Sequence, residues 1–255
     1  MPYEYINGPE QPNKCIIMPK GQAIAGHAIG ILVINIWYPL MPGNVANAST
    51  YRFPVLYKIL KEATIEKIVS GDPSLLDMVI EGGRELVQQG ARAVVGACGS
   101  FANYQRKAAA SLAVPTFLSV MMQAPLILQS LRHDQKLGIL AASASALTPE
   151  VFDQCGIVDT SRLVITEAVN LPEFNNIIQC TGRFNSHKLE QEVVDLMSRF
   201  VRENQDIGAI LIQCSDLPPY AWAIQNATGL PVFDMNTLIE WIYYAIVRHP
   251  YRGFI

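Results

Sequence analysis

Two cysteines in this chain end short apolar runs of the same kind. Cys98 closes the run Ala-Val-Val-Gly-Ala-Cys, and Cys214 closes the run Ala-Ile-Leu-Ile-Gln-Cys. Such runs are typical of buried strands in a parallel sheet, with the last residue emerging at the carboxyl edge. Two thiols on opposite sides of one small pocket could remove a proton from one face of a carbon and return one to the other face. The pair therefore predicts acid–base chemistry at a carbon centre.

The likeness between the two segments continues past the cysteines. Tyr104 and Tyr220 each follow their cysteine by six residues, and Pro115 and Pro231 follow by seventeen. A Gly-Ile-Leu run also precedes the two cysteines, by 68 and 76 residues. We therefore predict two α/β halves of similar order. If a two-fold axis relates them, the two strand ends face each other across the cleft between the halves, which is the expected active site.

Apolar runs alternate with amphipathic segments along the chain. This alternation predicts an α/β fold with two pseudo-symmetric domains, each with a mainly parallel sheet flanked by helices. We assign residues 1–130 to the first half and 131–235 to the second, and the C-terminal helix, 236–255, is a candidate to pack on the first half. The expected strands are 29–36, 93–98, 114–117, a run from 136, 209–214 and 230–233. The expected helices are 72–90, 101–112, 124–131, 186–204 and 236–247, with further helix starts at 148–150 and 218–219.

The composition favours a small-molecule partner. The chain has 255 residues and a net charge of −3, which offers no footprint for nucleic acid or an acidic membrane surface. The longest apolar stretch, 28–41, is shorter than the roughly 20 residues that a membrane span needs.

Five widely spaced cysteines without a secretory signal indicate a reducing cytoplasm and no disulfide framework. No metal-ligand spacing and no nucleotide-binding glycine motif is found, so neither metal nor cofactor is expected, and a homo-oligomer is the default.

The predicted position of the two thiols favours thiolate formation. A cysteine that ends a strand and precedes a helix lies near unpaired backbone N–H groups and the positive end of the helix dipole. Such positions can lower a thiol pKa from about 8.5 to between about 3.5 and 7.5. The alternative is that each is a small buried hydrophobic residue, as most free cysteines are. Cys15, Cys155 and Cys180 lack this setting and are expected to be structural or incidental.

Polar residues next to the cysteines are candidates to bind a carboxylate. Ser100 and Ser215 lie two residues and one residue beyond Cys98 and Cys214, where hydroxyl and backbone donors could hold an anion. The alternative is ordinary helix capping, and one residue can do both. Asp216 could polarise Cys214 or accept its proton, although an acidic residue in a first helical turn is also common on dipole grounds.

Two further groups of residues could complete the pocket. Asn35 ends the first strand and is expected to point into the cleft, where it could bind substrate or orient a thiol. The loop after it contains Tyr38 and is expected to roof the pocket, because open α/β sheets bind ligands at the carboxyl ends of their strands. Tyr104 and Tyr220 could close the pocket with ring or hydroxyl, the alternative being that both belong to the core.

Several stretches of the chain resemble the aspartate/glutamate racemase superfamily, in particular its branch of algal dimethylsulfoniopropionate lyases and bacterial relatives. The resemblance implies two pseudo-symmetric α/β domains with a cysteine pair at the cleft and no need for a metal or pyridoxal phosphate. By position, Cys98 and Cys214 would be the acid/base pair, with Ser100 and Ser215 beside the substrate carboxylate. Gly99 and Phe101, on either side of Ser100, are further candidate substrate-binding residues. Amino-acid racemases usually have asparagine after the first cysteine, where this chain has Gly99. The stretches that carry the resemblance are 42–44, 96–101, 145–149, 214–220 and 229–234.

Our leading hypothesis is a cofactor-independent racemase or isomerase that abstracts a proton next to a carboxylate with the Cys98/Cys214 pair. A lyase or decarboxylase of the same superfamily is the alternative, because a leaving group β to the carbanion turns the same machinery into an elimination. A two-lobed binding protein without catalysis and a thiol hydrolase that uses Cys98 alone are further alternatives.

Overall fold

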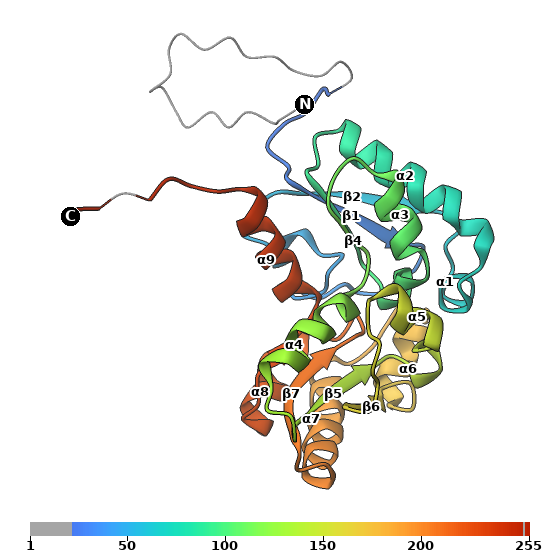
Figure 1. Ribbon diagram of the computed structural model, residues 1–255. Coiled ribbons are helices and arrows are strands. Elements are labelled where there is room, and N and C mark those ends of the chain that lie inside the picture. Colours follow the sequence, from blue (N-terminus) through green and yellow to red (C-terminus); the bar gives the residue numbers. More distant parts are fainter. Residues whose placement is uncertain (1–21, 252) are drawn as a thin grey trace.

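The fold consists of two four-stranded parallel sheets, each covered by helices (Figure 1). The computed structural model describes residues 22–251 and 253–255. The first sheet has the order β2-β1-β3-β4 and the second has the order β6-β5-β7-β8, and every pairing in them is parallel. The predicted α/β class with two similar sheets is therefore confirmed. The strands are β1 (Ile29–Ile34), β2 (Val55–Leu60), β3 (Ala93–Gly96), β4 (Thr116–Phe117), β5 (Lys136–Ala141), β6 (Leu163–Glu167), β7 (Ile207–Ile212) and β8 (Val232–Phe233).

The helices connect these strands and lie on the faces of the sheets. The α-helices are α1 (Ile65–Ser70), α2 (Leu76–Gln88), α3 (Gln105–Ser111), α4 (Ala124–Ser130), α5 (Pro149–Gln154), α6 (Pro172–Ile178), α7 (Ser186–Glu203), α8 (Ala221–Thr228) and α9 (Met235–Ile246). The short 3₁₀ helices are η2 (Ala48–Thr50), η3 (Pro73–Leu75), η4 (Gly99–Tyr104), η5 (Val120–Gln123), η6 (Ala144–Ala146) and η7 (Pro218–Tyr220). Several starts follow local rules: Thr148 caps α5 ahead of Pro149, and its side chain accepts from the backbone N–H of Val151.

The order of strands repeats between the two halves, as the sequence predicts. Strands β1 and β3 are central in the first sheet, and β5 and β7 are central in the second. Both central pairs are buried along nearly their whole length, which explains their near-continuous apolar sequences. Cys98 follows β3 and Cys214 follows β7, so the two cysteines occupy equivalent places at the carboxyl edges of their sheets.

Some elements differ from the sequence-based expectation. The first strand ends at Ile34, because the backbone N–H of Asn35 bonds to the carbonyl of Ala63 and leaves the sheet. The helix expected at 101–112 is divided into η4 and α3. The edge strands β2 and β6 are absent from the sequence-based expectation, whereas the edge strands β4 and β8 are part of it. Cys15 lies outside the described residues.

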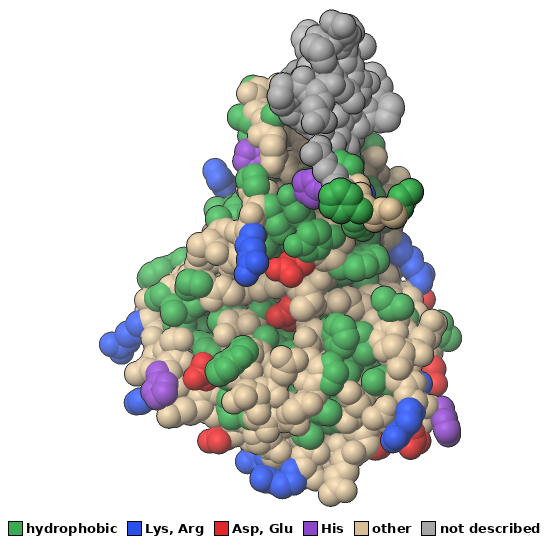
Figure 2. All heavy atoms as spheres, turned by 90° about the vertical axis from the view of Figure 1, so that its left-hand side faces the viewer, with side chains coloured by type: hydrophobic (Ala, Val, Ile, Leu, Met, Phe, Trp, Pro, Cys, Tyr) green, Lys and Arg blue, Asp and Glu red, His purple; other side chains and the backbone are tan. Residues whose placement is uncertain are grey.

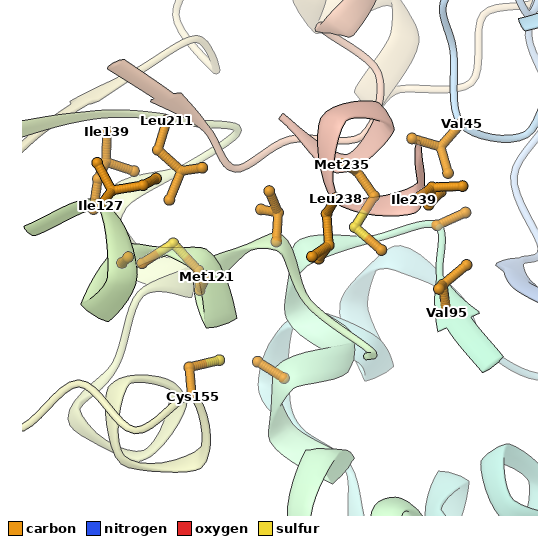
Figure 3. Close-up of a cluster of buried hydrophobic side chains, with 14 of the residues drawn as sticks. Val45, Val95, Met121, Ile127, Ile139, Cys155, Leu211, Met235, Leu238 and Ile239 are labelled. Carbon is orange, nitrogen blue, oxygen red and sulfur yellow. The ribbon is translucent and has the colours of Figure 1, made fainter. Parts of the chain in front are cut away.

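A continuous apolar core joins the two halves. Figure 3 shows Val95 of the first sheet and Leu211 of the second in one buried cluster, with Met235 and Leu238 of α9 drawn between them. Cys155 also lies in this cluster and is buried there, which fits the structural role expected for it. The assignment of 1–130 and 131–235 as separate domains stays a prediction.

The last helix returns from the second half to the first (Figure 1). The ring of Tyr243 stacks on that of Phe53, with their centroids 3.6 Å apart. The side-chain amide of Asn236, also on α9, donates to the carbonyl of Gly43 at 2.6 Å. On another side of the molecule, Arg106 of the first half forms an ion pair with Asp153 of α5. The two sheets are thus held together at more than one place around the cleft.

The surface carries no concentration of basic side chains on the face shown in Figure 2, where Lys and Arg are scattered. Within the described part of the chain, no helix combines the length and the apolar character needed to cross a membrane. Among these same residues, no group of three or more His, Cys, Asp and Glu side chains is arranged to hold a metal ion. The expectation that the protein forms a homo-oligomer stays a prediction.

We predict that the core of the second half depends strongly on Phe174. This side chain is fully buried, whereas Trp222 on α8, in the same half, is 74% exposed. The Phe174→Ala change should lower the free energy of unfolding by about 3–5 kcal/mol through lost burial and the cavity left behind. The matched Trp222→Ala change should alter it by no more than about 0.5 kcal/mol. Urea unfolding followed by circular dichroism measures both, and equal losses for the two variants would contradict the described packing.

Candidate active site

The ends of β3 and β7 meet directly between the two halves. The hydroxyl of Ser215 donates to the carbonyl of Ala97 at 2.9 Å, across the boundary between the sheets. The side chain of Gln213 lies against the backbone of Gly99. The residues that follow two equivalent strands therefore touch, and each strand end places its cysteine at the junction.

Both cysteines line one cavity of about 490 Å³. Its walls come from α1, from residues 142–148 after β5, and from Val169 and Ile178, and most of the lining side chains are aliphatic or small. Of the described residues that line it, only Glu66 and Asp216 are charged, and no lysine, arginine or histidine is among them. The cavity thus has room for a small molecule, and its fixed charges are negative.

Asp216 is held by one carboxylate oxygen and turns the other to Cys214. The Tyr38 hydroxyl donates to Oδ1 of Asp216 at 2.5 Å. The side-chain amide of Asn44 donates to the same Oδ1 at 3.2 Å and to the Tyr38 hydroxyl at 2.6 Å. Cys214 Sγ donates to Oδ2 at 3.7 Å. This geometry gives Cys214 a positioned proton acceptor, and Tyr38 lies behind Asp216 rather than in the lining of the cavity.

The pKa values of the two thiols are raised rather than lowered, contrary to the expectation from the sequence. Burial raises the pKa of Cys98 to about 11, although the backbone N–H and hydroxyl of Ser100 and the backbone N–H of Phe101 oppose the shift. Burial, followed by the negative charge of Asp216, raises the pKa of Cys214 well above its usual range. Burial also raises the pKa of Asp216, against the donors around it. None of the described residues that line the cavity is a cation that would offset these effects, so burial favours the protonated form of both thiols.

The expectation that Asn35 faces the cleft is wrong. Its side chain is exposed, and its amide donates to the carbonyl of Lys61 at 2.8 Å. The flanking Ile34 and Ile36 line the cavity instead, because successive side chains of extended backbone point to opposite sides.

The other predicted binding residues divide into two groups. Gly99 and Ser100 line the cavity. Phe101 is fully buried in the core of the first half and faces the site only with its backbone N–H. Ser215 lines the cavity, but its hydroxyl proton is donated to Ala97, so it joins the halves rather than offering a free donor.

The two repeat-related tyrosines belong to the core. Both are buried, and neither lines the cavity. The Tyr104 hydroxyl donates to the carbonyl of Asp72 at 2.8 Å, and the Tyr220 hydroxyl pairs with the Ser186 hydroxyl at 3.1 Å.

Sequence reasoning missed several residues of the cavity. Gln213 follows the apolar strand β7 directly before Cys214, and a polar residue at the end of this apolar run was the signal available. Ser143, Ser145 and Thr148 follow β5, the equivalent of β1, and also line the cavity. Glu66 on α1 carried no sequence signal, because its place beside the cavity depends on how α1 folds over the sheet edge.

Sequence comparison finds relatives that are dimethylsulfoniopropionate lyases, whereas no family model matches the chain. Dimethylsulfoniopropionate lyase 3 of Emiliania huxleyi is 26% identical over 241 residues, which are 90% of this chain and 63% of that protein. Dimethylsulfoniopropionate lyase 5 of the same organism is 26% identical over 93% of this chain and 49% of its own length. The lyase of Durusdinium sp. clade D is 25% identical over 92% of this chain and 80% of its own length. The chain thus spans 63% and 49% of the lengths of the first two relatives.

Structure comparison finds solved proteins with the same fold. Glutamate racemase isoform RacE1 from Bacillus anthracis has a TM-score of 0.53 at 16% identity, over 86% of this chain and 82% of that one. An aspartate racemase homologue from Pyrococcus horikoshii has a TM-score of 0.52 at 18% identity, over 84% of this chain and 98% of that one. Unliganded arylmalonate decarboxylase has a TM-score of 0.52 at 17% identity, over 89% of this chain and 94% of that one. This chain therefore has the fold of the aspartate/glutamate racemase superfamily, and its curated sequence relatives are dimethylsulfoniopropionate lyases.

Proposed function

We propose that the protein is a lyase of this superfamily that removes a proton next to a carboxylate and expels a neutral group from the adjacent carbon. The observation that carries the proposal is the pair formed by Cys214 and Asp216, which shares one cavity with Cys98 and with no basic side chain of the described residues. The sequence relatives are named for the cleavage of dimethylsulfoniopropionate, a small molecule with a carboxylate and a positively charged sulfonium group. We propose this molecule, or one of the same class, as the substrate.

The character of the cavity supports a substrate with a methylated cationic group. Such a group cannot donate hydrogen bonds from its charged centre, so it is well accommodated by aliphatic walls. Ile65, Ile68 and Val69 of α1 supply part of these walls, and the charged groups in the lining, Glu66 and Asp216, are both acidic. Because opposite charges attract strongly where water is excluded, the acidic groups favour the cation over a neutral analogue.

The positive charge of the substrate also opposes the burial that raises the pKa values of the two thiols. A positive charge close to Cys214 favours its thiolate, as a nearby opposite charge does for any acid. The Cys214 proton moves to Oδ2 of Asp216 as the substrate binds. The enzyme therefore forms its base when a substrate of the right charge is present.

The proposed elimination proceeds with a balanced transfer of electrons. The Cys214 thiolate takes the proton from the carbon next to the carboxylate, and the electrons of that C–H bond form a C=C bond. The electrons of the C–S bond leave with the sulfur, which departs as neutral dimethyl sulfide, and the organic product is acrylate. Asp216 then passes the extra proton to solvent. The dimethyl sulfide leaves without a proton, so Cys98 is not required as an acid for the leaving group.

Racemisation or isomerisation is the second candidate, because two thiols line the same cavity. In that reaction, Cys98 would return a proton to the face opposite Cys214. The two candidates differ in what they ask of Cys98, which allows them to be separated by experiment.

The first prediction for this function concerns the base. Incubation of the wild-type protein with dimethylsulfoniopropionate should release dimethyl sulfide and acrylate, measured by gas chromatography and by proton NMR. Cys214→Ser and Asp216→Asn should each lower the rate by about 10²–10⁴-fold, the usual contribution of a positioned base. Cys180→Ser, outside the cavity lining, is the matched control and should leave the rate unchanged. Absence of product from this substrate and from other β-onium carboxylates would contradict the lyase, and binding without turnover would favour the non-catalytic alternative.

The second prediction separates the lyase from the racemase. Cys98→Ser should lower dimethyl sulfide release by a smaller factor than Cys214→Ser does, because no proton has to reach the leaving group. If the protein is a racemase, both variants should abolish inversion of a chiral carboxylate and the wild type should exchange its α-hydrogen in deuterated water. Equal losses in the two variants, together with such exchange, would favour the second candidate.

The third prediction concerns pH. Asp216 accepts the Cys214 proton only when ionised, and burial raises its pKa from the ordinary carboxyl value of 3.8. The value of kcat/KM should therefore fall as pH decreases through a pKa higher than that of a free carboxyl group. The Asp216→Asn variant should lose this acid limb while keeping a low residual rate. An acid limb that is unchanged in Asp216→Asn would show that another group controls it.

A further inference from the structure

A loop of the first half reaches into the second half behind Asp216. This segment, which we call the β1–η2 loop, joins the two elements of that name through residues 35–47. Its Tyr38 belongs to the buried core of the second half, although the strand before it belongs to the first. A Cβ added to Gly43 would lie 2.8 Å from Cα of Pro219, so the loop lies directly on the segment that follows Asp216. The acceptor of the Cys214 proton therefore has neighbours from both halves.

The hydrogen bonds of the β1–η2 loop fix which of its groups donate. The backbone N–H of Ala46 donates to Oδ1 of Asn44 at 2.8 Å. Because a backbone N–H can only donate, the other end of the Asn44 carboxamide is its NH₂ group. This group donates to the oxygen of Tyr38, so the single hydroxyl proton of Tyr38 is directed to Asp216. Both loop side chains thus present donors to Oδ1 of Asp216.

Burial makes these two donors important. Tyr38 and Asn44 are both buried, so water does not readily replace them. Burial, followed by the negative charge of Asp216, raises the pKa of Tyr38 far above its ordinary value, so the hydroxyl keeps its proton. Burial also raises the pKa of Asp216, whereas the bonds from Tyr38 and Asn44 lower it. The other titratable groups that share the cavity with Asp216 are Cys98, Cys214 and Glu66.

We propose that Tyr38 and Asn44 are positioning residues that aim Oδ2 of Asp216 at Cys214 and stabilise the ionised carboxylate. The inference rests on the proposed function, because it explains how the acceptor of the Cys214 proton is held ready. With Oδ1 bound by two donors, rotation of the carboxylate would break both bonds, and Oδ2 is the oxygen left for the thiol. Neither Tyr38 nor Asn44 lines the cavity, so both act through Asp216.

The test measures the protonation of Asp216 directly and through turnover. In Tyr38→Phe and Asn44→Ala, the ¹³C carboxyl resonance of Asp216, assigned by its absence in Asp216→Asn, should titrate about 1–2 pH units higher than in the wild type, because hydrogen bonds to charged groups are the strong ones. The acid limb of kcat/KM for dimethylsulfoniopropionate should move upward by the same amount, since only ionised Asp216 accepts the thiol proton. Above this limb the rate should fall by less than about 10-fold, because the carboxylate itself is still present.

Tyr51→Phe is the matched control. The Tyr51 hydroxyl donates to the carbonyl of Val45 in the same loop, and the Tyr57 hydroxyl donates to that carbonyl as well. Loss of the Tyr51 hydroxyl therefore weakens an anchor of the loop but removes no donor from Asp216. Neither the titration of Asp216 nor the acid limb should move in this variant.

The outcomes separate a positioning role from general packing of the loop. An Asp216 titration that is unchanged in both Tyr38→Phe and Asn44→Ala would overturn the proposal, as would an equal shift in Tyr51→Phe. Turnover by the wild type alongside such a result would overturn the assignment of Tyr38 and Asn44 alone. A shift confined to these two variants, in a protein that does not cleave dimethylsulfoniopropionate, would support the positioning role and contradict the proposed lyase.

Discussion

The contact between the ends of β3 and β7 is the constraint on which the site depends. Ser215 bonds to Ala97 across the boundary of the two halves, and Gln213 fills the space above Gly99. Parallel strands expose their last residues at a common edge, and two such edges set against each other bring two equivalent positions together. The cysteines can share one cavity only because these backbone segments touch. The contact of α9 with the first half and the ion pair between Arg106 and Asp153 hold the edges in that relation.

The electrostatics of the site follow from burial without a compensating cation. Desolvation disfavours every charged form, and it raises the pKa values of both thiols and of Asp216. Burial therefore favours the protonated form of both thiols. In our proposal, the substrate brings the missing positive charge, and the donors of Tyr38 and Asn44 keep Asp216 ready to accept a proton. Activation of the base and recognition of the substrate are then the same event.

Local sequence patterns predicted much of the fold, and the elements that they missed have physical causes. Helix α7 covers 186–203, close to the predicted 186–204. The prediction succeeded because a long amphipathic segment with a capping residue indicates where a helix begins and ends. Strands β2 and β6 were not predicted because each is half-buried along most of its length and contains polar residues, which weakens its apolar pattern. The prediction for Asn35 failed because the strand ends at Ile34, two residues earlier than expected, and the Asn35 side chain bonds to the carbonyl of Lys61 away from the cavity.

The sequence by itself determined the α/β class, the two similar sheets and the equivalent placement of Cys98 and Cys214, because each follows from apolar periodicity and from spacing along the chain. The sequence did not determine the protonation state of the thiols. A helix start near a cysteine favours thiolate, but the depth of burial outweighs it, and burial depends on how the halves close over the site. Tertiary structure also decided the positions of Gln213 and Glu66 in the cavity wall. Their roles depend on neighbours from distant parts of the chain, and no local pattern records which distant residue will lie beside which.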